Sequence, residues 1–163
     1  MIITNGLVYD SLSGFVRREL RIQNDMIADV SDRLISPATS GEKSLDAAGC
    51  FIIPGLIDVH FHGCAGHDFC DGNKASLSKI AEYELRHGVT AICPASMSLP
   101  ADELKRIFAA AADYRRESCD KQQRADLLGI NMEGPFLSVK KKGAQNPDYI
   151  IKPDAAVIDE LTG

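Results

Sequence analysis

The 163-residue chain has no tryptophan, and aromatic residues make up only 6% of it. It carries 18 basic residues against 23 acidic ones, which gives a net charge of −5. A mildly acidic chain with few aromatic side chains has neither the positive surface nor the stacking platforms of a general nucleic-acid-binding protein. We therefore expect no nucleic-acid partner.

Long apolar runs are missing as well. No stretch approaches the ~20 apolar residues that a helix needs to cross a bilayer, and the start of the chain has no basic segment followed by an apolar one. The cysteines are odd in number and irregularly spaced, at positions 50, 64, 70, 93 and 119. This pattern fits reduced thiols better than a secreted disulfide framework, and Cys64 and Cys70 are too far apart for a CxxC zinc site. We expect a cytoplasmic protein with no membrane partner.

Residues 1–50 consist of short apolar stretches separated by turn-forming residues. The pattern predicts strands at Ile2–Thr4, Leu7–Tyr9, Met26–Val30 and Ser44–Ala48, with further strand character between Phe15 and Gln23. Asn5-Gly6 is a strong tight-turn signal. None of these residues has a pattern typical of catalysis, and we assign residues 1–50 to a first, all-β domain.

Near Gly49 the pattern changes to alternating strands and helices. We expect strands at 56–59, 89–94 and 127–132, and helices at 76–87, 100–117 and 154–161. This alternation is typical of parallel βα units, so we expect residues 51–163 to form an α/β domain. The short apolar run at 56–59 is typical of a buried strand. Because three parallel strands alone leave unpaired edges, the chain is either a small open α/β protein or part of a larger one.

The sharpest motif is His60-Phe61-His62, which directly follows the strand expected at 56–59. Residues i and i+2 of an extended chain point to the same face, and α/β enzymes build their sites where parallel strands end. Neutral imidazole is the commonest metal ligand, so His60 and His62 are candidate ligands of one ion. The alternative is one core histidine and one solvated histidine. Asp58 could accept a hydrogen bond from a ligating histidine, or bond to backbone at the strand end.

Glu133 follows the third expected strand, at the same end of the sheet. A carboxylate there is a candidate ligand for Zn²⁺ or Fe²⁺ beside the imidazoles, and Gly134-Pro135 would turn the chain and fix its direction. The alternative is an ordinary polar residue at a strand exit. Weaker candidates are Lys140–Lys142, which could attract an anion or form a solvated face, His67, which could line the site, and His87, which suits a helix C-terminus.

Together these motifs resemble a known family. Residues 54–63, Pro-Gly-Leu-Ile-Asp-Val-His-Phe-His-Gly, are similar to the first-strand signature of the amidohydrolase superfamily. Residues 132–136, Met-Glu-Gly-Pro-Phe, with Lys-Lys-Gly-Ala at 141–144 and Asn-Pro at 146–147, resemble the N-acetylglucosamine-6-phosphate deacetylases in particular. The HxH motif is shared by many amidohydrolases, whereas the second segment is much more specific. The resemblance covers nearly the whole chain.

The resemblance implies a metal-dependent hydrolase of amino sugar metabolism, which uses divalent Zn or Fe to remove the acetyl group of a sugar phosphate substrate. It implies the N-terminal part of a (β/α)8 TIM barrel, about three βα units, preceded by strands of a small β-sandwich, in a cytoplasmic homodimer. Glu133 matches the family's metal-binding glutamate, and His60 and His62 match a pair that binds a second metal in some members and is replaced in others. Ala144 and Gln145 match a dipeptide that contacts substrate. Gln145 stands where the family often has His, whose positive charge Gln cannot carry.

By the same resemblance, the remaining metal-binding histidines and the catalytic aspartate are expected beyond Gly163. We therefore expect an N-terminal fragment, or one of two pieces of a split enzyme, with no catalytic residue of its own. Two alternatives stay open. One is another amidohydrolase, dihydroorotase-like or imidazolonepropionase-like, against which the Glu-Gly-Pro-Phe segment speaks. The other is a non-catalytic fragment that self-associates through its open sheet edges.

Overall fold

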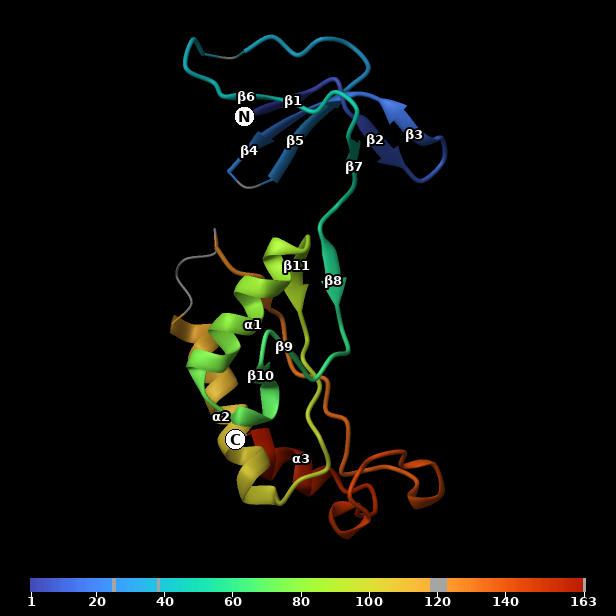
Figure 1. The fold of residues 1–163 in the computed structure, drawn as a ribbon, viewed down its shortest axis with the longest axis vertical. Helices are drawn as coiled ribbons and strands as arrows, with labels where there is room; N and C mark the ends of the chain where they lie inside the picture. The colour runs from blue at the N-terminus through green and yellow to red at the C-terminus, as the bar shows by residue number, and fades with distance from the viewer. Residues whose placement is uncertain (25, 38, 118–122, 163) are drawn as a thin grey trace. The chain divides into compact units, whose positions relative to one another are not determined.

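The computed structural model describes residues 1–24, 26–37, 39–117 and 123–162. The chain divides into two compact units, Met1–Pro54 and Gly55–Gly163 (Figure 1). No helix in the described ranges is both long enough and apolar enough to cross a membrane. Cys50, Cys64, Cys70 and Cys93 are free thiols, and Cys119 lies outside the described residues.

The first unit contains two small sheets. The four-stranded sheet has the order β5-β4-β1-β6 and the three-stranded sheet has the order β3-β2-β7. The strands are β1 (Ile2–Thr4), β2 (Leu7–Asp10), β3 (Gly14–Arg17), β4 (Glu19–Gln23), β5 (Met26–Ser31), β6 (Ser44–Asp46) and β7 (Phe51–Ile52). The predicted short strands are therefore present. Asn5 turns the chain with a φ of 63°, but the strands on either side of it belong to different sheets.

The second unit is built on a three-stranded parallel sheet in the order β12-β11-β8. Its elements are β8 (Leu56–Asp58), the hairpin β9 (Gly63–Cys64) and β10 (His67–Asp68), η1 (Phe69–Asp71), α1 (Lys74–Arg86), β11 (Val89–Ile92), α2 (Ala101–Glu117), β12 (Asp126–Leu127), η2 (Val139–Lys141), η3 (Pro147–Tyr149) and α3 (Ala155–Thr162). The mixed α/β architecture with parallel strands matches the sequence prediction.

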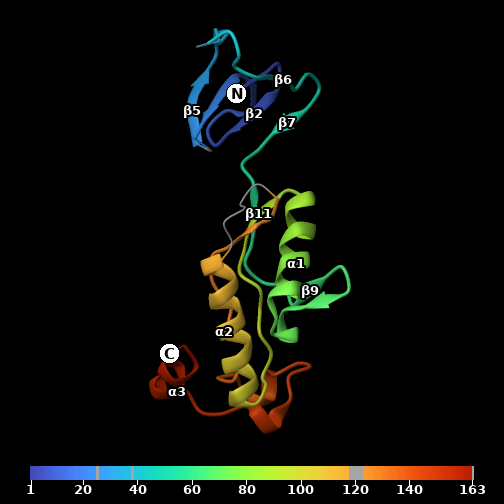
Figure 2. The same ribbon diagram turned by 90° about the vertical axis from the view of Figure 1, so that its left-hand side faces the viewer.

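Helices α1 and α2 bury the faces that their apolar spacing predicts. Asn73 caps α1, since its side chain accepts a hydrogen bond from the Ser76 N–H, and Gly88 follows the helix with a φ of 86° that suits glycine. The buried face of α1 includes Leu77, Ile80 and Ala81, and that of α2 includes Leu104, Ile107, Phe108 and Ala111. Figures 1 and 2 show both helices on the same side of the parallel sheet. The core therefore lies between these helices and the sheet.

The strand at 56–59 is in the expected place, but the prediction that it is buried was wrong. Leu56, Ile57 and Val59 are 51%, 59% and 58% exposed. Strand β8 is an edge strand with β11 as its partner within the sheet, so its apolar side chains lack cover on one side. The third strand is also shorter than the expected 127–132, because regular pairing of β12 ends at Leu127 and resumes only as a bridge between Ala95 and Asn131.

We expect Ile107→Ala to lower the free energy of unfolding by about 2–5 kcal/mol, because this fully buried side chain of α2 lies in the core and its loss leaves a cavity. Val139 of the same unit is 57% exposed, so Val139→Ala should change the free energy of unfolding by no more than about 0.5 kcal/mol. Urea unfolding of both variants measures the difference. Equal effects would mean that the core is not where the structure places it.

Candidate metal centre

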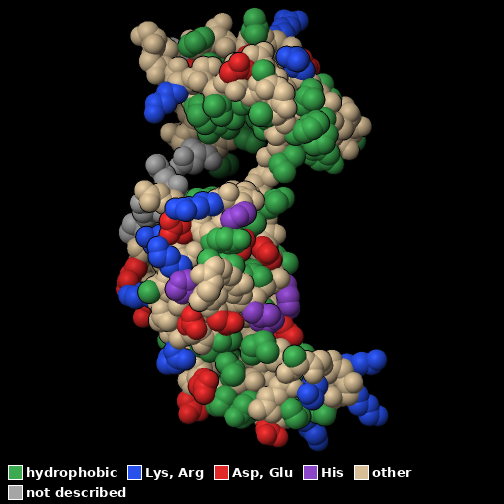
Figure 3. All heavy atoms as spheres, viewed as in Figure 1, with side chains coloured by type: hydrophobic (Ala, Val, Ile, Leu, Met, Phe, Trp, Pro, Cys, Tyr) green, Lys and Arg blue, Asp and Glu red, His purple; other side chains and the backbone are tan. Residues whose placement is uncertain are grey.

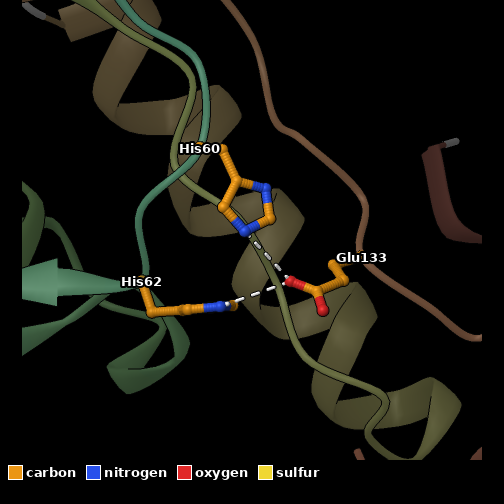
Figure 4. Close-up of side chains that lie close together, drawn as sticks. All are labelled: His60, His62 and Glu133. Carbon is orange, nitrogen blue, oxygen red and sulfur yellow. Dashed lines mark ion pairs between the residues drawn. The ribbon is translucent and has the colours of Figure 1, made fainter. Parts of the chain in front are cut away.

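The structure brings His60, His62 and Glu133 together where the parallel strands end. Their ligand atoms all lie within 4.8 Å of one another. The Oε2 atom of Glu133 is 3.4 Å from Nε2 of His60 and 3.3 Å from Nε2 of His62 (Figure 4). In the space-filling view, histidine and acidic side chains reach the surface of the second unit (Figure 3). The three residues predicted as metal ligands are thus adjacent, although Glu133 lies about 70 residues after His62 in the sequence.

The segment that follows β11 holds the two strand exits side by side. The Ala95 N–H donates to the Phe61 carbonyl at 2.7 Å, in the middle of the HxH motif. On the other side, the Ser96 N–H donates to the Asn131 carbonyl and the Asn131 N–H donates to the Pro94 carbonyl, both at 3.0 Å. Residues 94–96 therefore fix the histidines on one flank and the segment leading to Glu133 on the other.

Backbone groups also orient the histidines. Nδ1 of His62 lies 3.2 Å from the carbonyl oxygen of Ala95. Since a carbonyl only accepts, this contact requires a proton on Nδ1 of His62, and in the neutral ring the lone pair is then on Nε2, the atom that faces Glu133. Asp58 accepts a hydrogen bond from the His60 backbone N–H at 3.0 Å. The backbone role, one of the two considered for Asp58, is therefore the one that the structure shows.

Asn131 contacts the cluster and is a residue that the sequence reasoning missed. Its Nδ2 donates to the Val59 carbonyl at 2.7 Å and lies 3.2 Å from Nδ1 of His60. The available signal was its position two residues before Glu133, which places both residues on the same side of an extended strand exit. Asn131 links the exits of the first and third strands through its side chain.

The carboxylate of Glu133 is the feature that most favours a cation. Its Oε2 atom is buried and has no hydrogen-bond partner among the described residues. A buried carboxylate oxygen without a hydrogen-bond partner is costly, and a neutral imidazole that presents its lone pair to that oxygen does not reduce the cost. Two imidazoles and a carboxylate form a donor set typical of Zn²⁺ or Fe²⁺. The residues present therefore fit a divalent metal.

Gly134 sets the direction in which Glu133 leaves the strand. Its φ is 88°, in the left-handed region, and a Cβ at this position would lie 2.2 Å from Oγ and 3.1 Å from Cα of Ser98. Glycine is therefore required twice, by the backbone conformation and by the close approach of the segment after β11. This agrees with the predicted turn at Gly134-Pro135.

The residues matched to a substrate-contacting dipeptide lie in a separate loop. Gln145 is only 3% exposed; its Oε1 accepts from the Ser98 N–H at 2.6 Å and its Nε2 lies 3.4 Å from Sδ of Met97. Ala144 beside it is exposed. The side chain of Gln145 thus fastens its loop to the segment after β11, and the substrate roles of Ala144 and Gln145 stay predictions.

Part of the lysine run also has a local structural role. Lys142 donates from Nζ to the Gln145 carbonyl at 2.8 Å. Lys140 and Lys141 are exposed, as expected for a solvated face.

The other histidines lie outside the cluster. Nδ1 of His67 is 3.3 Å from Oγ of Ser76, which donates to Asp71 at 2.7 Å. This hydrogen bond from Ser76 is the main reason that the pKa of Asp71 lies below its usual range. His87 follows the last turn of α1, with Nδ1 2.8 Å from the Tyr83 carbonyl, in keeping with its predicted place at a helix C-terminus.

We expect Gly134→Ala to destabilise the chain more than Gly143→Ala. Both replace a left-handed glycine, which costs about 1–2 kcal/mol, but a Cβ at Gly143 would meet no atom of the described residues within 4 Å. The collision with Ser98 adds about 1–3 kcal/mol and displaces Glu133. Urea unfolding and Zn²⁺ titration measure the two effects. Equal losses in both variants would show that Ser98 does not constrain the turn.

Thiol reactivity provides a second check, in this case on the packing of Cys64 and Cys70 against the hydrophobic core of the second unit. Burial raises the pKa of Cys64 and of Cys70 to about 11, with a hydrogen bond to Glu84 adding to the effect at Cys64. At pH 8 only about one such thiol in a thousand is a thiolate. Iodoacetamide should therefore modify the exposed Cys50 well before either of them, and modification should accelerate as the pH rises toward 11. Peptide mass spectrometry gives the order, and early modification of Cys64 would contradict the packing.

Comparison with known proteins adds independent evidence. No protein-family model matches the chain. It is 29% identical over 158 residues to an N-acetylglucosamine-6-phosphate deacetylase of Lysinibacillus sphaericus, covering 97% of this chain and 39% of that protein. It is 33% identical over 112 residues to the Haemophilus influenzae deacetylase of the same name, covering 68% of this chain and 28% of that protein.

Solved structures agree with the sequence matches. The crystal structure of the Thermotoga maritima N-acetylglucosamine-6-phosphate deacetylase superposes with a TM-score of 0.78 at 28% identity, over 98% of this chain and 39% of that one. The Pasteurella multocida deacetylase shares the fold with a TM-score of 0.82 at 24% identity. The chain thus spans between 28% and 42% of the length of these four relatives. The family resemblance predicted from the sequence is confirmed: this chain is similar, along nearly its whole length, to a portion of the N-acetylglucosamine-6-phosphate deacetylases.

Proposed function

We propose that this chain is the portion of an N-acetylglucosamine-6-phosphate deacetylase that supplies part of the metal site. The observation that supports it best is the buried Oε2 of Glu133, which has no hydrogen-bond partner in the described part of the chain and lies 3.3 Å from Nε2 of His62. A second support is that both matched motifs, HxH and Glu-Gly-Pro-Phe, contribute to this one cluster. The reaction adds water across the N-acetyl amide and gives glucosamine 6-phosphate and acetate.

In this proposal Glu133, His60 and His62 hold the divalent metal, Zn or Fe. Such an ion polarises an amide carbonyl and makes a water molecule nucleophilic near neutral pH. Ala95 holds the His62 ring through its carbonyl, and Gly134 directs the carboxylate of Glu133. These residues therefore place the reactive centre before substrate arrives, which lowers the cost of assembling it during the reaction.

The rest of the machinery follows from the resemblance. Ala144 and Gln145 would contact the sugar phosphate, with Gln145 acting through the loop that it fastens to Ser98. The aspartate that exchanges the proton with the water and the leaving amine would lie in the part of the relatives that this chain does not span. Residues 51–163 would form the first βα units of a TIM barrel and residues 1–50 strands of a small β-sandwich, in a cytoplasmic homodimer.

The test is acetate release from N-acetylglucosamine 6-phosphate by the protein that contains this chain, with Zn²⁺ or Fe²⁺ added. We expect release that a chelator abolishes and that added metal restores. Glu133→Gln, which keeps the shape but removes the charge, should lower kcat/KM by about 100-fold or more, since metal ligands and their immediate supports carry effects of this size.

A surface variant provides the control for that comparison. Glu82 pairs with Lys79 and Arg86 on the exposed face of α1, so Glu82→Gln should leave the rate unchanged. The 163-residue chain by itself should bind metal without releasing acetate. Chelator-sensitive acetate release by that chain would refute the proposal that the catalytic aspartate lies outside it. Release from a dihydroorotate or imidazolone substrate, and none from the sugar phosphate, would favour the other amidohydrolases.

A further inference from the structure

Gln145 is a buried polar residue in a loop whose other residues are largely exposed. It is only 3% exposed, whereas Ala144 and Asn146 on either side of it are exposed. Burial of an amide is costly unless its polar atoms are bonded. Oε1 of Gln145 accepts from the Ser98 N–H at 2.6 Å, and Nε2 lies 3.4 Å from Sδ of Met97. The side chain is therefore directed into the protein, toward the segment that follows β11.

The backbone of Gln145 is bonded as well. Its N–H donates to the Lys142 carbonyl at 3.1 Å, and its carbonyl accepts from Nζ of Lys142 at 2.8 Å. These hydrogen bonds close residues 142–145 into one turn, in which Gly143 has a left-handed φ of 60°. Because the turn is closed on itself, the one side chain that enters the interior determines where the whole turn lies.

Ser98 also contacts the turn that follows Glu133. A Cβ at Gly134 would lie 2.2 Å from Oγ and 3.1 Å from Cα of Ser98, so these two residues are in close contact. Gly134 directly follows Glu133, which is one of the three candidate metal ligands. Ser98 itself is only 2% exposed. One buried residue therefore supports both the turn that carries the carboxylate and the loop that carries Gln145.

We propose that Gln145 is a positioning residue, which places the loop 142–145 beside the metal cluster by accepting the hydrogen bond of the Ser98 N–H. The assignment of this loop to the sugar phosphate rests on the proposed function; the anchoring does not. Gln145 acts from within the protein, and the exposed Ala144 is the neighbour that the loop presents outward. Because Ser98 also touches Gly134, the loop and the metal ligand share one support, which sets their spacing before either is occupied.

Hydrogen exchange tests the anchor directly. Gln145→Leu keeps a side chain of similar size but leaves the buried Ser98 N–H without its acceptor for as long as the loop stays docked. The docked population should therefore fall about tenfold relative to the undocked one, the factor expected for one unpaired buried donor. Exchange mass spectrometry should show this acceleration in the peptides that contain Ser98 and residues 142–146.

Steady-state kinetics of the protein that contains this chain then separate positioning from general destabilisation. In Gln145→Leu we expect KM for N-acetylglucosamine 6-phosphate to rise about threefold to tenfold, since only the docked fraction binds substrate. The value of kcat should fall by less than about twofold, because the lost interaction is the same in the ground state and the transition state. Zn²⁺ affinity should not change. A merely structural role would lower the unfolding temperature and leave KM of the folded enzyme unaltered.

Gln145→Glu is the conservative variant that should rescue both measurements. Its carboxylate can still accept from the Ser98 N–H, and hydrogen bonds to a charged acceptor are the stronger kind. Exchange and KM should therefore return toward their wild-type values. If the side chain faced the phosphate group instead, the added negative charge would raise KM further than Gln145→Leu does. Asn146→Ala is the matched control in the same loop, because the side chain of Asn146 accepts from the Asp148 N–H. It should alter neither measurement.

Four results would overturn the proposal. These are unchanged exchange at Ser98 in Gln145→Leu, an unchanged KM in that variant, a higher KM in Gln145→Glu than in Gln145→Leu, and rapid exchange of the Ser98 amide in the wild type. The last decides the matter even if a variant does not fold. Exchange needs no activity, so accelerated exchange in Gln145→Leu without acetate release from the wild-type protein would refute the proposed function and leave the anchoring in place.

Discussion

The parallel pairing of β11 with its two neighbours is the constraint on which the site depends. Because β8 and β12 run in the same direction on either side of β11, their carboxyl ends emerge together. The pairing then continues past the regular strands, where residues 94–96 bond to Phe61 on one flank and to Asn131 on the other. These backbone hydrogen bonds set the spacing between the histidines and Glu133, so the side chains need only small adjustments to converge.

The same sheet is open on both sides, and this openness explains where apolar surface remains. Leu56, Ile57 and Val59 are exposed at the β8 edge, and a hollow of about 380 Å³ lined by Leu127, Ile130 and Met132 borders the β12 exit. Parallel strands bury both faces in complete α/β folds. In the proposed barrel, further strands would pair with both edges and cover this surface, while the core between α1, α2 and the sheet already closes within the chain.

Sequence periodicity predicted what depends on local structure. The apolar spacing of α1 and α2 was sufficient to place their buried faces, and alternate spacing along an extended chain was sufficient to bring His60 and His62 to one side. The exposure of β8 was mispredicted because burial depends on neighbouring strands and not on the apolar residues themselves. Gln145 was matched to a substrate contact, and only the fold shows its side chain bonded to Ser98.

Asn131 marks the limit of sequence reasoning at the site. An asparagine near a strand end is unremarkable by type, and its bond to the Val59 carbonyl spans 72 residues. Yet its amide donates to the Val59 carbonyl and lies 3.2 Å from Nδ1 of His60, so it links the exits of the first and third strands beside the cluster.

The electrostatics of the site follow from the buried carboxylate. The Oε2 atom of Glu133 lies 3.4 Å from Nε2 of His60 and 3.3 Å from Nε2 of His62, and it has no hydrogen-bond partner among the described residues. Burial of a carboxylate oxygen without a partner is costly, and a positive charge beside it offsets that cost. A divalent cation held by His60, His62 and Glu133 would supply that charge. The fold therefore pre-positions two imidazoles and one carboxylate as a donor set for such an ion.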